Sequence, residues 1–209
     1  FFAFNVFTQS FWVEQNSGVS VSLNSVTNSN WVGAGWTCGN NGTVLRTSNY
    51  GSNWINVSGN GIPPDVQLNT ISDCNTFYEY AIVAGKRGDT AIVYRTTNTG
   101  ASWQIVFRQL NGKINGISLG NSSIGFMTGN PVGGRWSIWK STNNGLTWDS
   151  TGMYLPQNSV ESGWNNSFMN VGTYLFFGTN NSRLYYSSNQ GINWLFITIP
   201  GITNIVSLD

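Results

Sequence analysis

The chain is organised around one stretch, Thr47-Ser48-Asn49-Tyr50-Gly51-Ser52-Asn53-Trp54. Three further copies are Thr96-Thr97-Asn98-Thr99-Gly100-Ala101-Ser102-Trp103, Ser141-Thr142-Asn143-Asn144-Gly145-Leu146-Thr147-Trp148 and Ser187-Ser188-Asn189-Gln190-Gly191-Ile192-Asn193-Trp194. All four fit the pattern (S/T)-x-N-x-G-x-x-W, and their tryptophans follow one another at 49, 45 and 46 residues. A period in the forties with turn residues at fixed offsets is typical of an all-β fold built blade by blade.

The chemistry of the repeated unit explains why these residue types recur. Ser, Thr and Asn side chains can bond nearby backbone N–H groups and hold a tight turn. Gly adopts backbone conformations that a residue with a Cβ resists, and the Trp ring can bury a large apolar area beneath the turn. The structural repeat residues are therefore Asn49, Gly51, Trp54, Asn98, Gly100, Trp103, Asn143, Gly145, Trp148, Asn189, Gly191 and Trp194.

Runs of β-branched and aromatic residues lead into and out of each copy, which predicts four short strands per period. The predicted fold is a single β-propeller domain over residues 1–209, with repeats at about 19–62, 63–112, 113–158 and 159–201. The expected strands are Val19–Val26, Trp31–Cys38, Thr43–Thr47 and Trp54–Val57; Val66–Ser72, Tyr80–Gly85, Ala91–Thr96 and Trp103–Arg108; Ile114–Leu119, Ile124–Thr128, Trp136–Ser141 and a weaker Trp148–Leu155; and Gly163–Asn170, Tyr174–Gly178, Leu184–Ser187 and Trp194–Ile199.

The two ends of the chain, residues 1–16 and 202–209, predict a partial fifth blade. Ser10–Asn16 has the character of an outermost strand with its Trp but no preceding turn unit, and Ile202–Asp209 that of an innermost strand. The pieces either close the propeller within one chain or pair between chains, since unpaired strand edges bind other strands. The candidate assembly residues are Phe1, Phe2, Phe4, Phe7, Ile205 and Leu208.

The repeated unit resembles the Asp-box (BNR) repeat of sialidase-type and sortilin-type β-propellers. It is still more similar to the repeat of photosystem II assembly-factor-like propellers, in which a strand such as Gly42-Thr43-Val44-Leu45-Arg46-Thr47 precedes the turn. The resemblance covers nearly the whole chain and implies a propeller that serves as a cofactor-free assembly factor. The Asp typical of the box is Asn in all four copies, so a role that needs a carboxylate there is in doubt.

The composition favours a folded, weakly charged protein. Of 209 residues, 40% are hydrophobic, only 8% are charged, and the net charge is +1. This balance gives no basic footprint for nucleic acid or a membrane surface, and it does little to oppose self-association. No apolar run reaches the 18 residues that a membrane-spanning helix needs.

The first residues admit two interpretations. Phe1–Ser10 resembles either the end of a secretory signal, with small residues at Thr8 and Ser10, or a strand of the mature protein. The chain does not begin with Met, so we expect it to be processed or incomplete. Cys38 and Cys74 either form one disulfide in an oxidising compartment or are two small buried thiols. We expect a secreted or extracellular protein, with a cell-surface location open.

Several catalytic classes are excluded or disfavoured. The chain has no histidine, which removes Ser-His-Asp and Cys-His catalysis. A glycosidase needs two carboxylates across one bond, and the candidates are Glu14, Asp65, Asp73, Glu79, Asp89, Asp149, Glu161 and Asp209. A sialidase needs converging arginines, yet Arg46, Arg95, Lys140 and Tyr186 hold one repeat position and are expected to point outward from different blades.

Two binding functions remain open. Asn side chains and carbonyl groups could hold Ca²⁺, though weakly without clustered carboxylates. An exposed aromatic group could stack on a sugar, and the tryptophans outside the repeated unit include Trp31, Trp36, Trp136, Trp139 and Trp164. We predict a non-catalytic module without cofactor or metal that assembles into an oligomer or filament. The alternative is a glycoside-hydrolase or carbohydrate-binding propeller.

Overall fold

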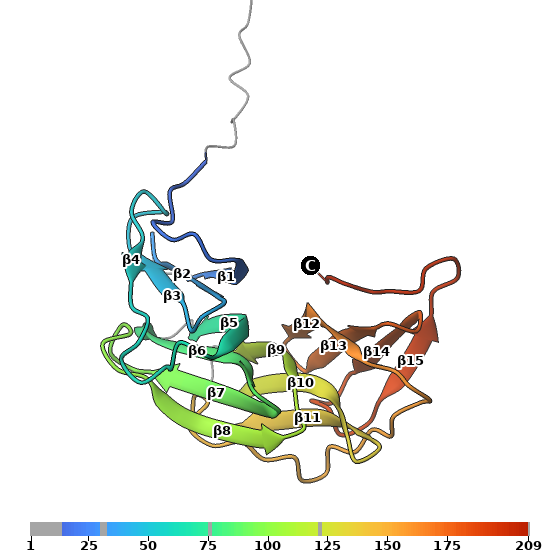
Figure 1. The fold of residues 1–209 in the computed structure, drawn as a ribbon. Coiled ribbons are helices and arrows are strands. Elements are labelled where there is room, and N and C mark those ends of the chain that lie inside the picture. Colours follow the sequence, from blue (N-terminus) through green and yellow to red (C-terminus); the bar gives the residue numbers. More distant parts are fainter. Residues whose placement is uncertain (1–13, 30–32, 75–76, 121–122, 209) are drawn as a thin grey trace, which may run out of the picture.

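The computed structural model describes residues 14–29, 33–74, 77–120 and 123–208. Every regular element within these ranges is a β-strand. The strands form four antiparallel sheets that stand side by side in an open arc, with the C-terminal end of the chain in the opening between the first sheet and the last (Figure 1). Among the described residues we find no helix of the length and apolarity needed to cross a bilayer.

Each sheet follows the chain from its innermost to its outermost strand. The first sheet contains β1 (Leu23–Asn28), β2 (Gly35–Gly39), β3 (Val44–Thr47) and β4 (Ile55–Asn56). The second contains β5 (Gln67–Cys74), β6 (Phe77–Arg87), β7 (Thr90–Thr96) and β8 (Gln104–Leu110). The fourth contains β12 (Gly163–Val171), β13 (Tyr174–Thr179), β14 (Arg183–Ser187) and β15 (Leu195–Thr198).

The third sheet differs from the predicted four-stranded blade. It has three strands, β9 (Ile114–Leu119), β10 (Gly125–Val132) and β11 (Arg135–Ser141). In place of the outer strand expected at Trp148–Leu155, two isolated bridges join Lys140 to Asp149 and Arg135 to Pro156. Asp149 starts a local turn by accepting a 3.0 Å hydrogen bond from the Thr151 N–H, and this turn carries the chain away from β11 between the two bridges.

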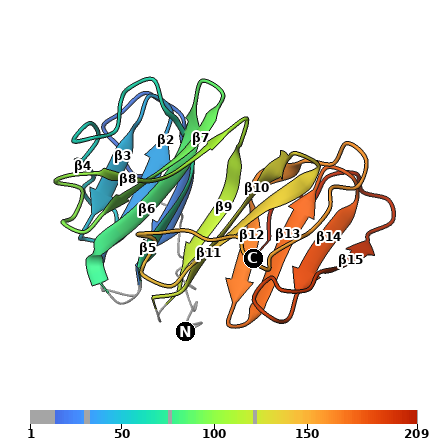
Figure 2. The ribbon, with the colours of Figure 1, turned by 90° about the horizontal axis from the view of Figure 1, so that it is seen from below.

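The apolar core lies between the sheets in three separate layers. Trp36 and Val44 meet Val83 and Trp103 between the first and second sheets. A second layer between the second and third sheets contains Ile82, Val93, Ile117 and Met127. A third, between the third and fourth sheets, contains Phe126, Trp136, Leu175 and Phe177. Figure 2 shows the resulting order of sheets, each packed face to face on its neighbour.

Each repeated turn is held by the same three side-chain bonds, shown here for the second copy. The Thr96 hydroxyl oxygen accepts the Gly100 N–H at 3.0 Å and donates to Asn98 Oδ1 at 2.9 Å. Asn98 Oδ1 also accepts the Ser102 N–H at 3.0 Å. Equivalent bonds recur around Asn49, Asn143 and Asn189. The amide oxygen therefore performs the acceptor role of a carboxylate in this turn.

The glycine in each turn is required by both conformation and space. Gly100 has φ +83° and follows Thr99 at +58°, the left-handed pair of a type I′ turn. A Cβ on Gly100 would lie 2.8 Å from Val57 at the end of the first sheet. The turn of each sheet therefore packs against the sheet before it, which links the local repeat to the assembly of the arc.

The inner strands come together at the centre of the arc. The Asn166 side chain on β12 donates a 2.9 Å hydrogen bond to the Asn24 carbonyl on β1, across 142 positions of sequence. A cavity of about 370 Å³ lies here, lined by residues from β1, β5, β9 and β12. The first and last sheets thus meet at their inner strands and diverge toward their outer strands.

A β-bulge in the inner strands places an asparagine at equivalent points of the first three sheets, namely Asn24, Asn69 and Asn115. Asn24 donates to the Leu68 carbonyl of the next sheet at 2.7 Å. In the fourth sheet the bulge contains Ser167, which donates to the Ile205 carbonyl at 2.8 Å. The sequence pairs Leu23-Asn24, Leu68-Asn69 and Ile114-Asn115 carry this signal, which our sequence analysis missed.

The C-terminal segment occupies the place of a next inner strand without forming a fifth sheet in the described residues. The Ser182 N–H donates to the Thr203 carbonyl at 2.9 Å, as the Gly42 N–H donates to the Val66 carbonyl just before β5. Ile205 is buried against Gly178. This proposed assembly residue therefore packs within its own chain, whereas Phe1, Phe2, Phe4 and Phe7 lie outside the described residues.

Gln15 occupies the corresponding place before the first sheet. It lies against Gly51 as Val57 lies against Gly100, and the Trp54 indole donates to Gln15 Oε1 at 3.3 Å. In the next sheet the Trp103 indole donates to the Val57 carbonyl at 3.2 Å. Gln15 thus contacts the first sheet as the end of a preceding outer strand would.

Candidate functional site

The residues before each turn join neighbouring sheets. Arg95 Nε donates to the Asn144 carbonyl in the turn of the third sheet at 2.7 Å, and its guanidinium lies 4.9 Å from the Tyr80 ring centre. Lys140 Nζ donates to Gln190 Oε1 in the turn of the fourth sheet at 2.7 Å. Asn144 and Gln190 hold the same position in their turns, so these cations act as ties from one sheet to the next.

The other two members of this repeat position lack such a tie. Arg46 lies over the Trp36 ring at 5.6 Å, and Tyr186 stacks on Phe176 with ring centres 6.4 Å apart. As predicted, the four side chains belong to different sheets, and no arginine cluster forms from them.

The acidic side chains are distributed over the molecule with local partners. Asp65 pairs with Arg87 at 2.8 Å, and the hydrogen bond from Arg87 lowers the pKa of Asp65. Asp89 lies 3.6 Å from Lys86, while Asp73 is buried and accepts a 2.8 Å bond from Thr27. None of the four cavities that we describe is lined by two carboxylates. Across the described ranges, no three Cys, Asp or Glu side chains gather as metal ligands would.

Glu161 forms the most developed polar cluster. Its carboxylate, wholly buried, lies 3.1 Å from Arg183 Nη1 and accepts a 2.8 Å hydrogen bond from the Tyr185 hydroxyl. Burial, followed by the bond to Glu161, raises the pKa of Tyr185. Arg183 in turn lies 4.5 Å from the Phe196 ring centre. This Tyr–Glu pair is enclosed between β14 and the segment that enters β12, so it fixes that segment and is closed to a sugar ring.

The expected disulfide is not formed. Cys38 and Cys74 are both free and buried. Cys38 belongs to the core layer between the first two sheets and Cys74 to the layer between the second and third. The prediction of a Cys38–Cys74 bridge was wrong because the second sheet separates the two thiols. Cys38, on the first sheet, points toward one face of the second sheet, and Cys74 points away from the opposite face.

The tryptophans outside the repeated unit are mostly packing residues. Trp36 and Trp136 are buried, and Trp139 packs edge to face on Phe107 with ring centres 4.8 Å apart. Trp164 is 40% exposed, and Trp31 lies outside the described residues. A platform of several exposed indoles for sugar stacking is absent from the described part of the chain.

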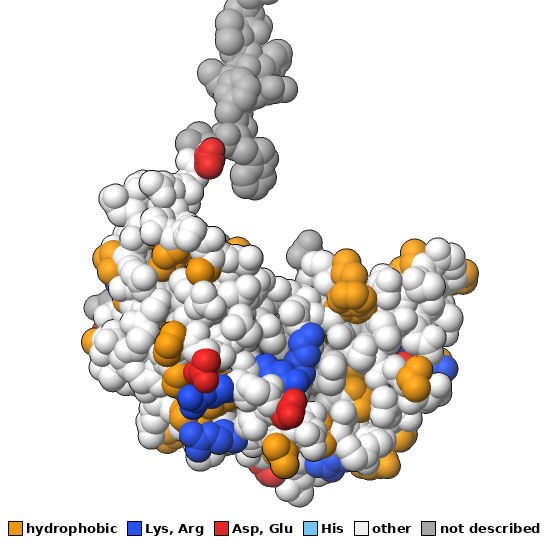
Figure 3. All heavy atoms as spheres, viewed as in Figure 1, with side chains coloured by type: hydrophobic (Ala, Val, Ile, Leu, Met, Phe, Trp, Pro, Cys, Tyr) orange, Lys and Arg blue, Asp and Glu red, His pale blue; other side chains and the backbone are white. Residues whose placement is uncertain are grey.

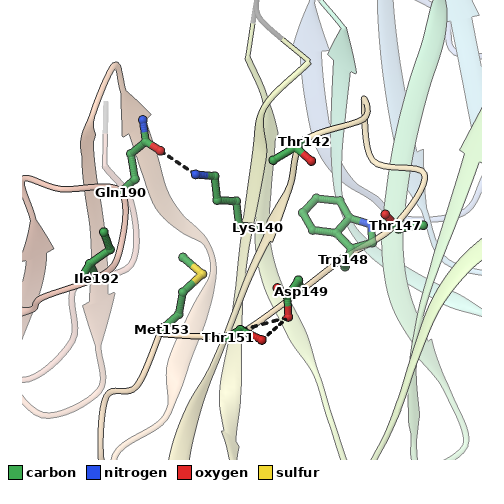
Figure 4. A pocket seen from close by; sticks show the side chains of 9 residues that line it. All are labelled: Lys140, Thr142, Thr147, Trp148, Asp149, Thr151, Met153, Gln190 and Ile192. Atoms are coloured by element: carbon green, nitrogen blue, oxygen red, sulfur yellow. Dashed lines mark hydrogen bonds between the residues drawn. The ribbon is translucent and has the colours of Figure 1, made fainter.

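A groove of about 330 Å³ opens between the third and fourth sheets where the outer strand of the third is missing (Figure 4). Lys140 and Gln190 join across it, and Trp148, Met153 and Ile192 form apolar parts of its wall. Its one carboxylate, Asp149, accepts bonds from Thr151, and these bonds lower its pKa. The groove therefore presents polar and apolar contacts, with its charged groups already bonded to protein.

The outward face of the fourth sheet carries several exposed apolar side chains. Tyr174 stacks on Phe176 of the same strand with ring centres 6.3 Å apart. Leu195 and Ile197, two strands away on β15, are 62% and 49% exposed. On the side of the molecule drawn in Figure 3, charged groups are few, and uncharged polar groups and backbone cover most of the surface. Contacts made by this face are therefore governed by apolar burial.

The outward face of the first sheet is hollowed. A cavity of about 480 Å³ is lined by Gln15, Val26, Tyr50 and Trp54 together with backbone of β1 and β2. Val26 and Tyr50 are 70% and 72% exposed. The outward faces of the first and last sheets therefore expose apolar side chains. Between the interior sheets, comparable side chains are covered by the neighbouring sheet.

Searches of family profiles and of curated proteins found no match to this chain. Solved structures do match. YCF48 bound to D1 peptide aligns at 16% identity and TM-score 0.54, over 89% of this chain and 74% of that one. YCF48 from Cyanidioschyzon merolae aligns at 16% identity and TM-score 0.61, over 86% of this chain and 57% of that one.

Two other propeller structures match this chain with comparable identities and TM-scores. An ancestral GH74 enzyme aligns at 17% identity and TM-score 0.59, over 84% of this chain but only 25% of the enzyme. The propeller domain of Cps50 (Swd1) from Myceliophteria thermophila aligns at 12% identity and TM-score 0.61, over 91% of this chain and 59% of that one. At these identities the likeness concerns the fold alone: the chain is a β-propeller whose repeats resemble those of photosystem II assembly-factor-like proteins.

Proposed function

We propose that this protein is a non-catalytic interaction module that binds further copies of itself through the outward faces of its first and last sheets. The similar folds of YCF48, with its bound D1 peptide, and of Cps50 support a role in protein contacts. A non-catalytic role is supported by the carboxylates, because no two of them line the same one of the cavities described above.

One observation carries the proposal. Trp36, Ile82, Phe126 and Phe176 hold equivalent places beside the residue before the turn. The first three are at most 1% exposed because the next sheet covers them, whereas Phe176, on the open face of the last sheet, is only half-buried, beside Tyr174 and Tyr186. Covering a large apolar side chain gains about 1.5–3 kcal/mol, so a partner sheet on this face is favoured.

The interior of the arc indicates how the partner would be oriented. The turn glycine of one sheet packs against a side chain of the sheet before it, as Gly100 packs against Val57 and Gly145 against Ile82. The contacts between neighbouring sheets therefore all have the same direction, head to tail. The same contact between copies would bring the last sheet of one to the first sheet of another, and repetition of a head-to-tail contact gives a ring or a filament. The N-terminal segment Phe1–Asn16 would add a strand at this junction, beside the C-terminal segment, which is docked on the fourth sheet of its own chain.

A location outside the cell is part of the proposal. It is supported by the apolar N-terminal stretch and by the low share of charged residues, 8%. The cysteines give no support, since they are free and buried.

The alternative is a carbohydrate-binding or glycoside-hydrolase propeller. The similarity to the GH74 enzyme favours it only at the level of fold. The groove at Lys140, Trp148 and Gln190 is the surface that such a function would use, because it combines an indole with hydrogen-bonding groups.

Sedimentation velocity of a Leu195→Lys, Ile197→Lys double variant tests the proposal. The wild-type chain should form larger species as its concentration rises, and the double variant should remain monomeric with an unchanged β-sheet circular dichroism spectrum. The control is Val160→Lys, because Val160 is 84% exposed and lies outside both faces. A wild-type chain that stays monomeric, or a double variant that associates equally well, would refute it.

A further inference from the structure

Among the three cations that stand before a turn in the described part of the chain, Arg46 is the one that forms no hydrogen bond to the next turn. Its counterparts Arg95 and Lys140 each donate at 2.7 Å to the fourth residue of the following turn. The corresponding residue for Arg46 is Thr99. The Thr99 hydroxyl points back to its own turn and donates to the Asn98 carbonyl at 2.7 Å. Unlike Gln190 beside Lys140, it receives no hydrogen bond from Arg46 Nε.

The Arg46 guanidinium consequently has unused hydrogen-bonding capacity. Its Nε is shielded from solvent and has no hydrogen-bond acceptor in the described part of the chain. The Trp36 ring, 5.6 Å away, holds the guanidinium from one side. A buried donor without an acceptor is unfavourable, so a ligand that offers oxygen atoms here would be stabilised.

The space beside Arg46 is suited to a small ligand. A pocket of about 250 Å³, the Arg46 pocket, is lined by Arg46, Ile55, Val57, Asn60, Thr99, Gly100 and Ala101. Ile55 is 54% exposed, and with Val57 and Ala101 it gives the pocket an apolar wall. The lining contains no acidic side chain, so the positive charge of Arg46 is not neutralised there.

We propose that the Arg46 pocket binds a carboxylate carried on a short aliphatic group. The two oxygen atoms of a carboxylate match the planar fork of a guanidinium. They would take the acceptor role that the Asn144 carbonyl has for Arg95 and that Gln190 Oε1 has for Lys140. The aliphatic part would lie against Ile55 and Val57. A glutamate side chain and the C-terminus of a peptide that ends in a small residue both present this chemistry.

Titration followed by ¹H–¹⁵N NMR at the Arg46 Nε–H tests the site. The probes are N-acetylglutamate amide and N-acetyl-glycyl-alanine with a free carboxyl group, which separate the side-chain source from the C-terminal source. Their neutral counterparts are N-acetylglutamine amide and the amidated dipeptide. At least one acid should give saturable shifts in the millimolar range, weakened by added salt, and both neutral probes should give none.

Three variants locate the binding at Arg46. Binding by the variants is followed at the backbone amides of Thr99, Gly100 and Ala101, which line the pocket. Arg46→Gln should weaken binding at least fivefold, while Lys140→Gln, at the equivalent position of another sheet, should leave it unchanged. Thr99→Gln should also abolish binding, because it gives Arg46 the internal acceptor that Gln190 gives Lys140. Gln190 shares with Thr99 a φ of +58°, so this variant should fold. Absence of saturation by both acids, or full binding by Thr99→Gln, would overturn the proposal.

Discussion

At the scale of single residues, the repeated turn explains how an Asp-box-like unit works with Asn. The amide oxygen of each Asn accepts both the hydroxyl and the backbone N–H that hold the turn. In the second and third copies the amide nitrogen also donates, to Ser102 at 2.9 Å and Thr147 at 2.8 Å. The negative charge of an Asp is therefore unnecessary for the geometry, in line with the low charge of the chain.

Asn98→Asp should leave the free energy of unfolding within about 0.5 kcal/mol of wild type, because the carboxylate keeps both acceptor bonds. Asn98→Ala removes both acceptor bonds and the bond donated to Ser102, and it should cost about 1–3 kcal/mol. Urea unfolding followed by tryptophan fluorescence measures both values. Thr97→Ala is the control, since Thr97 is an exposed neighbour in the same turn. Equal stability of the Ala and Asp variants would contradict the role given to Asn98.

Cys38 should make the protein sensitive to alkali. Burial raises the pKa of its thiol far above the ordinary value of 9.0. The unfolded chain therefore loses this proton above about pH 9 while the folded chain keeps it. The stability contributed by the protonated thiol is complete below pH 9 and declines above it, by up to about 1.4 kcal/mol per pH unit.

Chemical unfolding at a series of pH values from 7 to 10 measures this slope. Cys38→Ala should lower stability at neutral pH because it leaves a small cavity, but its stability should fall less steeply above pH 9 than that of the wild type. Parallel curves for the two proteins would show that Cys38 does not titrate on unfolding. Tyr94 and Tyr185, whose pKa values are also raised by burial, add their own decline at still higher pH in both proteins.

At the scale of elements, the strands and the turns between them were largely predictable from sequence. Ile114–Leu119 was predicted to the residue, and Tyr174–Gly178 differs from β13 by one residue. These strands are short runs rich in apolar residues and bounded by turn residues, so the local signal and the tertiary structure agree. The prediction of an outer strand in the third sheet was wrong because Asp149 and Thr151 form a local turn, which competes with pairing to β11.

The features that were missed depend on contacts distant in sequence. The role of Asn24 requires the Leu68 carbonyl of another sheet, and the ties made by Arg95 and Lys140 require the following turn. Similarly, the separation of Cys38 and Cys74 follows from which face of a strand each occupies, and a one-residue change of register reverses that face. A local pattern predicts elements well and the contacts between them poorly.

Ile205→Ala should destabilise the protein by about 2–4 kcal/mol, the usual cost of truncating a buried Ile. Ile205 is 6% exposed, and its N–H donates to the Thr179 carbonyl at 3.0 Å. The variant should therefore also exchange the Ile205 amide hydrogen faster than wild type. Val206→Ala is the matched control because Val206 is 55% exposed. An Ile205→Ala variant as stable as this control would show that the C-terminal segment is not docked on the fourth sheet.

At the scale of the whole molecule, the arc closes at its centre and stays open at its periphery. The Asn166–Asn24 bond joins the inner strands of the first and last sheets, while their outward faces carry apolar side chains that no other sheet of the described residues covers. This arrangement follows from the repeat itself, because every sheet is built to be covered by the next one. The central claim is that association between copies covers these two faces.

Hydrogen–deuterium exchange of the intact chain at low and high concentration tests this claim most directly. We predict that concentration slows exchange in β13 to β15 and around Val26 and Tyr50, the two faces that would be covered. Exchange in β8, on the periphery of the second sheet, should remain the same at both concentrations. Identical exchange of all described segments at the two concentrations, or protection confined to β8, would contradict the account.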